Sequence, residues 1–432
     1  MPQSARRSSS LSPVRGSVCA MTPDGRKSAG RGKVLHVGTS IELFTGTGGL
    51  ALAMDKAGFR HQLAVEIDRR ACATLRANVA DDVDVGTLPL QDGSDLWPLI
   101  AGDIRKVDFT PWEGKADVVA GGVPCQPWSL GGVHRGFGDT RNMWPELFRC
   151  VREVRPRAIV AENVKGLLRP SFRPYYDYIL RELAAPFERR IEGEEWFDHD
   201  KRLVKALKTD GVDPTERYDV HFQLVNAADY GIPQQRWRVF VVALRRDLGL
   251  GDWKFPKPTH SESALLHGQI SGEYWDEHDI RPRELGVEPT RSVPPPHDGL
   301  IRWRTLRDAI GELPEPIGYK VEHPDWLHHV GWPGARIYAG HTPNELDRPA
   351  KTVKAGVHGV PGGESVLRKD DGTIRYLTVR EVARIMTFPD SWWLAGPRGE
   401  QMRQLGNAVP VELGVAMANA VAKALRSTTK VR

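Results

Sequence analysis

The chain has 432 residues, of which 40% are hydrophobic and 27% charged, as in a soluble globular protein with two or three cores. No uninterrupted apolar run approaches the roughly 20 residues needed to span a bilayer, so no membrane role is expected. Four scattered cysteines disfavour a disulfide framework or a structural zinc site and favour a reducing, cytoplasmic setting.

The formal charge is unevenly distributed. Residues 1–33 carry seven basic side chains and one acidic side chain, a balance of +6, so the remaining chain carries −1 of the total of +5. This segment is rich in Ser, Arg, Gly and Pro, lacks the apolar core of a secretory signal, and is expected to be a disordered basic tail. Bulk charge therefore does not decide the function.

Short β-branched runs alternate with helical patterns from residue 34 onward. Strands are predicted in "KVLHVGTSIELF", "HQLAVEID", "DVVAGGV" and "RAIVAENV", and helices in "GLALAMDKAGF", "RRACATLRANV", "NMWPELFRCVREVRP" and "PYYDYILREL". This alternation predicts an α/β domain with a doubly wound parallel sheet over residues 34–245. Two further runs, 219–225 and 238–244, are expected to close the sheet as an antiparallel pair.

The composition changes after residue 245. Residues 246–375 are crowded with Pro, Gly, His and Trp and predict a smaller, irregular domain with short strands. Helical patterning returns in residues 376–432, which are expected to pack back on the first domain. Residues 187–217 look like an insertion to which no role is assigned.

A glycine-rich corner, "ELFTGTGGLALAM" at 42–54, follows the first predicted strand. Glu66 stands twenty residues past Gly46 at the end of the next strand, where its carboxylate could accept from ribose hydroxyls. Asp103, at the edge of a third strand, could accept from an exocyclic amine. These residues favour a nucleoside pocket, although ordinary loop glycines and acids would give the same pattern.

Four other residues are expected near the same edge of the sheet. Cys125, in "GGVPCQPWS", follows a strand and is a candidate nucleophile, while Glu162 ends the next strand and could donate a proton to a ring nitrogen. Arg236 and Arg238 alternate along a strand and suit a carbonyl oxygen or a phosphate. An inert cysteine and solvated arginines are the simpler alternatives.

Taken in order, "ELFTGTGG", "VEID", "GDI", "GGVPCQPWS", "ENV", "QQRWR", "RPAKTV" and "LGNAVP" closely resemble the cytosine-5 DNA methyltransferases, in particular bacterial type II modification enzymes, over residues 38–425. The resemblance implies a Rossmann-like fold that binds S-adenosylmethionine. Carried over to this sequence, the cofactor-binding residues are Phe44, Gly46, Gly48, Glu66, Asp103 and Asn407. Val123, Trp128 and Glu42 depart from the family pattern.

The resemblance also implies a reaction. Cys125 would add to C6 of a flipped cytosine, Glu162 would protonate or hydrogen-bond N3, and Arg238 would hold O2 with support from Arg236. No metal is required. The glycine-rich loop 129–141 would close over DNA and place Ser129, His134 and Arg135 near the base or its phosphates, unless it is merely a mobile surface loop.

The irregular domain would read a specific sequence of double-stranded DNA, with contacts expected at Thr352 and Lys354 and at arginines such as Arg302 and Arg304. The family implies a monomer and a cognate restriction endonuclease that acts on the same site without a stable complex. Two alternatives remain: an RNA cytosine-5 methyltransferase with the same motifs, and a catalytically silent DNA-binding protein.

Overall fold

The computed structural model describes residues 36–84, 96–124, 142–281, 293–337, 342–355 and 365–429. The chain from Lys33 onward forms one compact unit. The expected basic tail, residues 1–33, lies outside the described residues.

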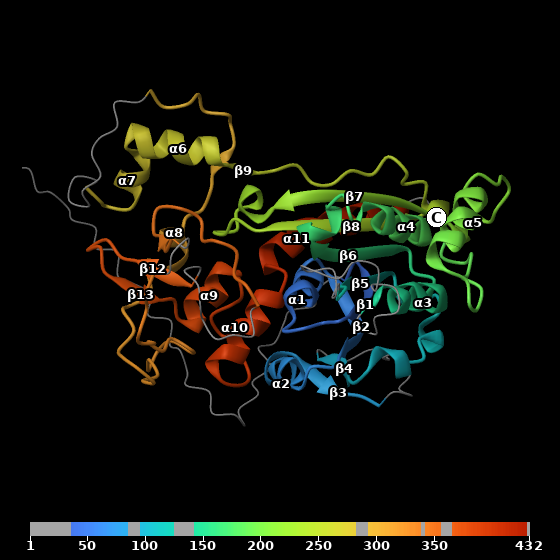
Figure 1. The fold of residues 1–432 in the computed structure, drawn as a ribbon, viewed down its shortest axis with the longest axis horizontal. Coiled ribbons are helices and arrows are strands. Elements are labelled where there is room, and N and C mark those ends of the chain that lie inside the picture. The colour runs from blue at the N-terminus through green and yellow to red at the C-terminus, as the bar shows by residue number, and fades with distance from the viewer. Residues whose placement is uncertain are drawn as a thin grey trace, which may run out of the picture. The chain divides into compact units, whose positions relative to one another are not determined.

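An eight-stranded sheet with the order β3-β4-β2-β1-β5-β6-β8-β7 forms the centre of this unit (Figure 1). Six strands pair in parallel, whereas β8 runs antiparallel to both of its neighbours. The predicted doubly wound α/β fold and its closing antiparallel pair are confirmed. The strands are β1 (Gly38–Leu43), β2 (Phe59–Glu66), β3 (Ala80–Asp82), β4 (Trp97–Ala101), β5 (Val118–Gly122), β6 (Ala158–Val164), β7 (Tyr218–Asn226) and β8 (Trp237–Arg245).

Apolar side chains cover both faces of the sheet because strand residues alternate between them. One face packs against α3 (Trp144–Val154) and α4 (Arg173–Ala184), and the other against α1 (Gly49–Lys56) and α11 (Val411–Thr429). Helix α2 (Arg69–Asn78) begins at Asp68, whose carboxylate accepts from the backbone N–H groups of Arg70 and Ala71.

The last helix packs directly on the first. A Cβ added to Gly414 of α11 would lie 2.6 Å from Cβ of Ala53 in α1, so the glycine permits the close approach. Helix α11, near the end of the described chain, therefore lies against α1; the division of the chain into a first domain and a returning segment stays a prediction. The stretch Arg398–Thr428 is long and apolar enough to cross a membrane by length and composition, but 67% of its apolar 18-residue window is buried within the fold, as expected of a core helix.

The insertion 187–217 contains a helix, α5 (Trp196–Ala206), that packs against α4. His199 of α5 is fully buried; its Nδ1 lies 3.1 Å from the hydroxyl oxygen of Tyr178, which donates to Glu182. A polar network in the contact thus fixes the position of α5, since each buried polar group has a partner there.

Residues 246–375 form short elements, as predicted, in two small sheets of two and three strands. They are β9 (His260–Ser261), α6 (Glu262–Ser271), α7 (Glu273–Glu277), β10 (Ile301–Arg302), α8 (Leu306–Ile310), β11 (Asn344–Glu345), β12 (Val366–Arg368) and β13 (Ile374–Tyr376). Helices α9 (Val379–Ile385) and α10 (Arg398–Asn407) follow. One apolar core joins α1 and α2 to α8, α9 and α10, so packing is continuous across residue 375, and the proposed domain boundaries stay a prediction.

Candidate active site

Parallel strands end together at one edge of the sheet, and the chain places most of its polar motif residues there. The ends of β1, β2, β4, β5 and β6 supply the glycine corner, Glu66, Asp103, Val123 and Glu162. Because β8 is reversed, its beginning lies at this same edge, and Arg238 is the Cα partner of Val164. Strand order reverses beside β1, where α/β proteins bind their ligands.

The glycine corner has an unusual backbone. Phe44, Gly46 and Gly48 have φ angles of 55°, 57° and 93°. Glycine adopts such angles without steric cost, whereas a phenylalanine held there costs about 1–3 kcal/mol. The half-buried Phe44 ring packs against the core under α3 and α4, which helps to hold this conformation.

The Glu66 carboxylate fastens the corner to β2. Its Oε2 accepts from the N–H of Gly46 at 2.7 Å, and its Oε1 accepts from the N–H groups of Ile67 and Asp68 at 2.9 and 2.7 Å. Burial raises the pKa of Glu66, while the backbone hydrogen bonds oppose that shift. Oε2, which accepts a single hydrogen bond here, keeps a further acceptor position for a hydroxyl group, whereas Oε1 already accepts two.

Asp103 is engaged by a neighbour. It accepts from the backbone N–H of Arg105 at 3.0 Å and forms an ion pair with that guanidinium, with a shortest distance of 2.5 Å. The hydrogen bonds from Arg105 hold the pKa of Asp103 below its ordinary value. The pair is partly exposed, so its interaction is weakened by solvent.

Asn407 is exposed at the end of α10, next to the glycine corner. A Cβ on Gly49, the first residue of α1, would lie only 2.3 Å from the carbonyl oxygen of Val409. Residues 407–409 therefore lie against the start of α1, as the expected return of "GNAVP" to the pocket requires.

Glu162 and Arg238 form a buried ion pair. Nε of Arg238 lies 2.8 Å from Oε1 of Glu162, and the two side chains are 12% and 9% exposed. Burial raises the pKa of Glu162, and the positive charges of Arg238 and Arg236 oppose the shift. A carboxyl group that holds its proton more tightly than usual, beside a guanidinium, suits proton donation and oxygen binding within one pocket.

Arg236 is fully buried and is turned toward backbone carbonyls. Its Nη1 donates to Val353 at 2.8 Å, and its Nη2 donates to Gly406 at 2.7 Å and Ala408 at 3.0 Å. Burial lowers its pKa to about 9. Arg236 thus joins the start of β8 to two distant segments.

Cys125, Ser129, His134 and Arg135 lie outside the described residues, so their expected roles stay predictions. The chain leading to them is described as far as Pro124. Nδ2 of Asn163 donates to the carbonyl oxygen of Val123 at 3.0 Å, and Gly122 is the Cα partner of Glu162. The segment just before Cys125 is thereby fixed beside Glu162.

Thr352 and Lys354 follow a segment that is bonded to the start of β8. Oγ1 of Thr352 donates to the carbonyl oxygen of Gln235 at 2.8 Å, while Lys354 is exposed. Both residues therefore lie close in the chain to the contacts of Arg236. Their expected contact with DNA stays a prediction.

Three residues in or beside the glycine corner were not predicted from the sequence to be site residues. Glu42 Oε1 and Thr47 Oγ1 are buried and have no hydrogen-bond partner among the described residues. Burial raises the pKa of Glu42 well above its ordinary value. Ile67, next to Glu66, is 65% exposed. An apolar residue directly after the acidic one was the available signal for Ile67; Glu42 had been noted only as a departure from the family pattern.

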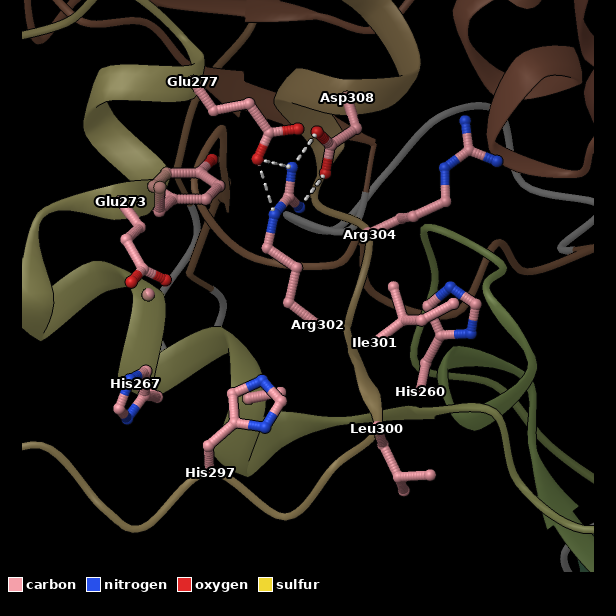
Figure 2. A pocket seen from close by; sticks show the side chains of 13 residues that line it. His260, His267, Glu273, Glu277, His297, Leu300, Ile301, Arg302, Arg304 and Asp308 are labelled. Carbon is pink, nitrogen blue, oxygen red and sulfur yellow. Dashed lines mark hydrogen bonds and ion pairs between the residues drawn. The ribbon is translucent and has the colours of Figure 1, made fainter.

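A separate groove of about 580 Å³ lies between α6, α7 and β10 (Figure 2). The guanidinium of Arg302 is held there between Glu277, at 2.9 Å, and Asp308, at 2.8 Å. Arg304 is 40% exposed and lies 3.6 Å from Glu412. Of these two arginines, Arg304 is therefore the one with a more accessible charge.

Among the described residues, no group of three or more His, Cys, Asp or Glu side chains could hold a metal ion. Cys72 and Cys150 are free and buried, and burial raises the pKa of both thiols, that of Cys72 to about 12. Neither has the lowered pKa that activates a thiol nucleophile.

The model of the C-5 cytosine-specific DNA methylase family matches residues 38–185 and 199–423. The chain belongs to this family. It is 32% identical over 403 residues to the type II methyltransferase M.Eco47II of Escherichia coli, covering 91% of this chain and 81% of that protein. It is 30% identical over 393 residues to M.NgoMIV of Neisseria gonorrhoeae, covering 90% and 98%.

Solved structures share the fold. A prophage-encoded E. coli protein described as a DNA modification methyltransferase superposes with a TM-score of 0.54 at 20% identity, covering 90% of this chain and 99% of that one. The predicted Rossmann-like methyltransferase fold is therefore confirmed. The protein is a DNA (cytosine-5-)-methyltransferase of the type II restriction-modification class. The gap in the match, residues 186–198, overlaps the first part of the insertion 187–217 and ends within α5.

Proposed function

We propose that this enzyme transfers a methyl group from S-adenosylmethionine to C5 of a cytosine flipped out of a specific double-stranded DNA sequence. The observation that carries the proposal is the buried Glu162–Arg238 pair at the sheet edge, beside the segment that leads into Cys125. A proton donor and an oxygen ligand at this place suit activation of a pyrimidine ring.

The glycine corner fits the cofactor. Oε2 of Glu66 presents an acceptor for a ribose hydroxyl, and exposed Ile67 and half-buried Phe44 offer apolar surface. Glu42 Oε1 and Thr47 Oγ1, which are buried and have no partner among the described residues, can form hydrogen bonds with the cofactor. No basic residue stands in "ELFTGTGG", as suits a ligand without a pyrophosphate. When bound, S-adenosylmethionine supplies an electrophilic methyl group.

The chain's own residues prepare the cytosine. The Cys125 thiolate forms a bond to C6 while Glu162 donates a proton to N3, so that electron density develops at C5 without charge on the ring. Arg238 donates to O2 and keeps Glu162 in place. After methylation, the C5 proton passes to a base or water, the electrons return to the ring and expel the Cys125 thiolate, and N3 gives its proton back to Glu162. Base flipping, at a cost of a few kcal/mol, exposes C6 to the thiol.

Trapping on DNA that contains 5-fluorocytosine tests this mechanism, because fluorine cannot leave as a proton does. A covalent adduct that requires S-adenosylmethionine and disappears in Cys125→Ala supports it, and an adduct that survives this substitution contradicts it. Incubation with labelled cofactor and either duplex DNA or tRNA tests the substrate; labelling confined to RNA contradicts the proposal.

The proposal extends to cellular role. Bacterial type II methyltransferases among the relatives support protection of host DNA from a cognate restriction endonuclease. We propose that the enzyme does this as a monomer in the cytoplasm. Bisulfite sequencing of DNA from a host that expresses the protein identifies the methylated sequence. Resistance of that DNA to cleavage by the nuclease encoded beside it tests the protective role.

A further inference from the structure

Arg236 holds the two carbonyl groups on either side of Asn407. Its Nη2 donates to Gly406 at 2.7 Å and to Ala408 at 3.0 Å, and the side chain is fully buried. The planar guanidinium offers donors in a fixed fork, which a lysine ammonium cannot reproduce. Asn407 itself stays exposed. Its backbone is therefore fixed by bonds to both neighbours while its side chain remains accessible.

The segment held in this way determines where the glycine corner lies. Gly49 at the start of α1 approaches the Val409 carbonyl so closely that an added Cβ would lie 2.3 Å from it. A Cβ on Gly406 would lie 2.5 Å from the backbone nitrogen of Ala355. Close backbone packing on both sides leaves little room for residues 406–409 to shift independently.

The other contacts of Arg236 lead to the base pocket and to the segment around Thr352. Arg238, two residues along β8, pairs with Glu162, and Nη1 of Arg236 donates to the Val353 carbonyl. Gln234 strengthens this connection because its Oε1 accepts from the N–H of Val353 at 3.1 Å. One buried side chain thus contacts the segments that carry the expected cofactor, base and DNA residues.

We propose that Arg236 is a positioning residue that couples cofactor binding to DNA binding by fixing Asn407 relative to the Glu162–Arg238 pair. It acts through the Gly406 and Ala408 carbonyls and does not touch the cytosine. The inference rests on the proposed function, since it assumes that Asn407 contacts S-adenosylmethionine. Each ligand favours the arrangement that the Arg236 bonds hold over arrangements in which they are broken, so each raises the affinity for the other.

Arg380 in α9 provides a matched control. It is also fully buried, and it donates to the carbonyls of Leu327, Pro389 and Trp392 at 2.9–3.0 Å. Burial lowers its pKa to about 10. None of these carbonyls flanks Asn407, although the Trp392 ring packs near Gly48, where an added Cβ would lie 3.2 Å from it. Arg380→Met therefore removes a similar set of buried hydrogen bonds without releasing Asn407.

The experiment uses the full chain and measures the affinity for S-adenosylhomocysteine by calorimetry, with and without a DNA duplex carrying the sequence found by bisulfite sequencing. In the wild type, DNA should raise this affinity by a factor within the usual range for coupled sites, roughly 5-fold to 150-fold. Arg236→Met should abolish that factor and weaken binding without DNA, and Arg236→Lys should have the same effects to a smaller extent. Arg380→Met should lower the melting temperature and leave the DNA-dependent factor unchanged.

A double-mutant cycle with Asn407→Ala tests the route of the effect. If Arg236 acts through Asn407, Arg236→Lys should weaken cofactor binding much less when Asn407 is already alanine. The proposal is overturned if Arg236→Lys keeps wild-type affinity and coupling, if its loss is fully additive with Asn407→Ala, or if Arg380→Met gives the same loss. Since the lysine variant keeps the charge, it preserves the test if the methionine variant does not fold. A wild-type chain that binds no S-adenosylhomocysteine would instead contradict the proposed function.

Discussion

Replacement of Glu162 by Gln separates the charge of the buried pair from its shape. The Gln amide oxygen can still accept from Arg238, which now lies 2.8 Å from the carboxylate. Because the Arg238 guanidinium stays charged, its hydrogen bond to the Gln oxygen still contributes about 1.5–3 kcal/mol, and the substitution removes mainly the attraction between the two opposite charges. Relief from burying an ionised carboxylate, worth several kcal/mol, offsets this loss. At pH 8 the unfolding free energy of E162Q should therefore equal or exceed that of the wild type.

The dependence of the unfolding free energy on pH shows which protonation state of Glu162 stabilises the fold. Because burial raises the pKa of Glu162 above 4.5 in the folded chain, its protonation contributes stability that is fully present below about pH 4.5 and lost as pH rises through the folded pKa. The Gln side chain does not titrate. The unfolding free energy of the wild type minus that of E162Q should therefore fall with rising pH, as measured by urea denaturation at several pH values.

Activity should respond differently from stability. Loss of a general acid lowers rates by roughly 10²-fold to 10⁴-fold, and methyl incorporation by E162Q should fall in that range. Glu182 provides the control, since it is 3% exposed, accepts from Tyr178 at 2.7 Å and lies outside the site. E182Q should keep wild-type activity. Activity of E162Q within threefold of the wild type would refute the proton-donor role, and a stability difference that grows with pH would refute the electrostatic reasoning.

Three further substitutions test the surroundings of the pocket. Gly49→Ala should lower both the melting temperature and cofactor affinity, because the new Cβ would lie 2.3 Å from the Val409 carbonyl; an unchanged melting temperature would show that this contact can relax. Glu66→Ala removes the acceptor of three backbone N–H groups and should cost about 1–3 kcal/mol for each donor left buried and unpaired, measured by urea denaturation; a cost below 1 kcal/mol would contradict its role in fastening the corner. Arg304→Ala should reduce the salt dependence of DNA binding by about one unit of slope if this accessible guanidinium meets a phosphate, whereas an unchanged slope would place the groove of Figure 2 away from the DNA backbone.

The sequence predicts the sheet and its edge because local patterns determine both. Alternation of strands and helices orders the sheet, and strand ends bring Glu66 and Glu162 to the same edge. Local patterns do not specify partners distant in the chain. Alternation along the chain that leads into β8 could place Arg236 and Arg238 on one face. It could not show that Arg238 pairs with Glu162, or that Arg236 donates to the carbonyls of Gly406 and Ala408.

Composition also predicts less about residues 246–375 than their packing in the structure shows. Proline and glycine mark residues 246–375 as irregular, yet the apolar side chains of α8 and α9 share a core with α1 and α2. A core depends on which faces meet, and that information is distributed over the whole chain. For the same reason, the orphaned buried atoms of Glu42 and Thr47 became recognisable only once their surroundings were described.

The packing of α11 on α1 has a consequence for the synthesis of the enzyme. The surface of α1 that contains Ala53 is covered by Gly414 and its neighbours, near the other end of the chain. A ribosome-bound chain that has emerged only as far as β8 therefore leaves an apolar face of its sheet uncovered. The domain that is first in sequence should complete its folding last, after translation of α11, and until then its exposed face is a binding site for chaperones.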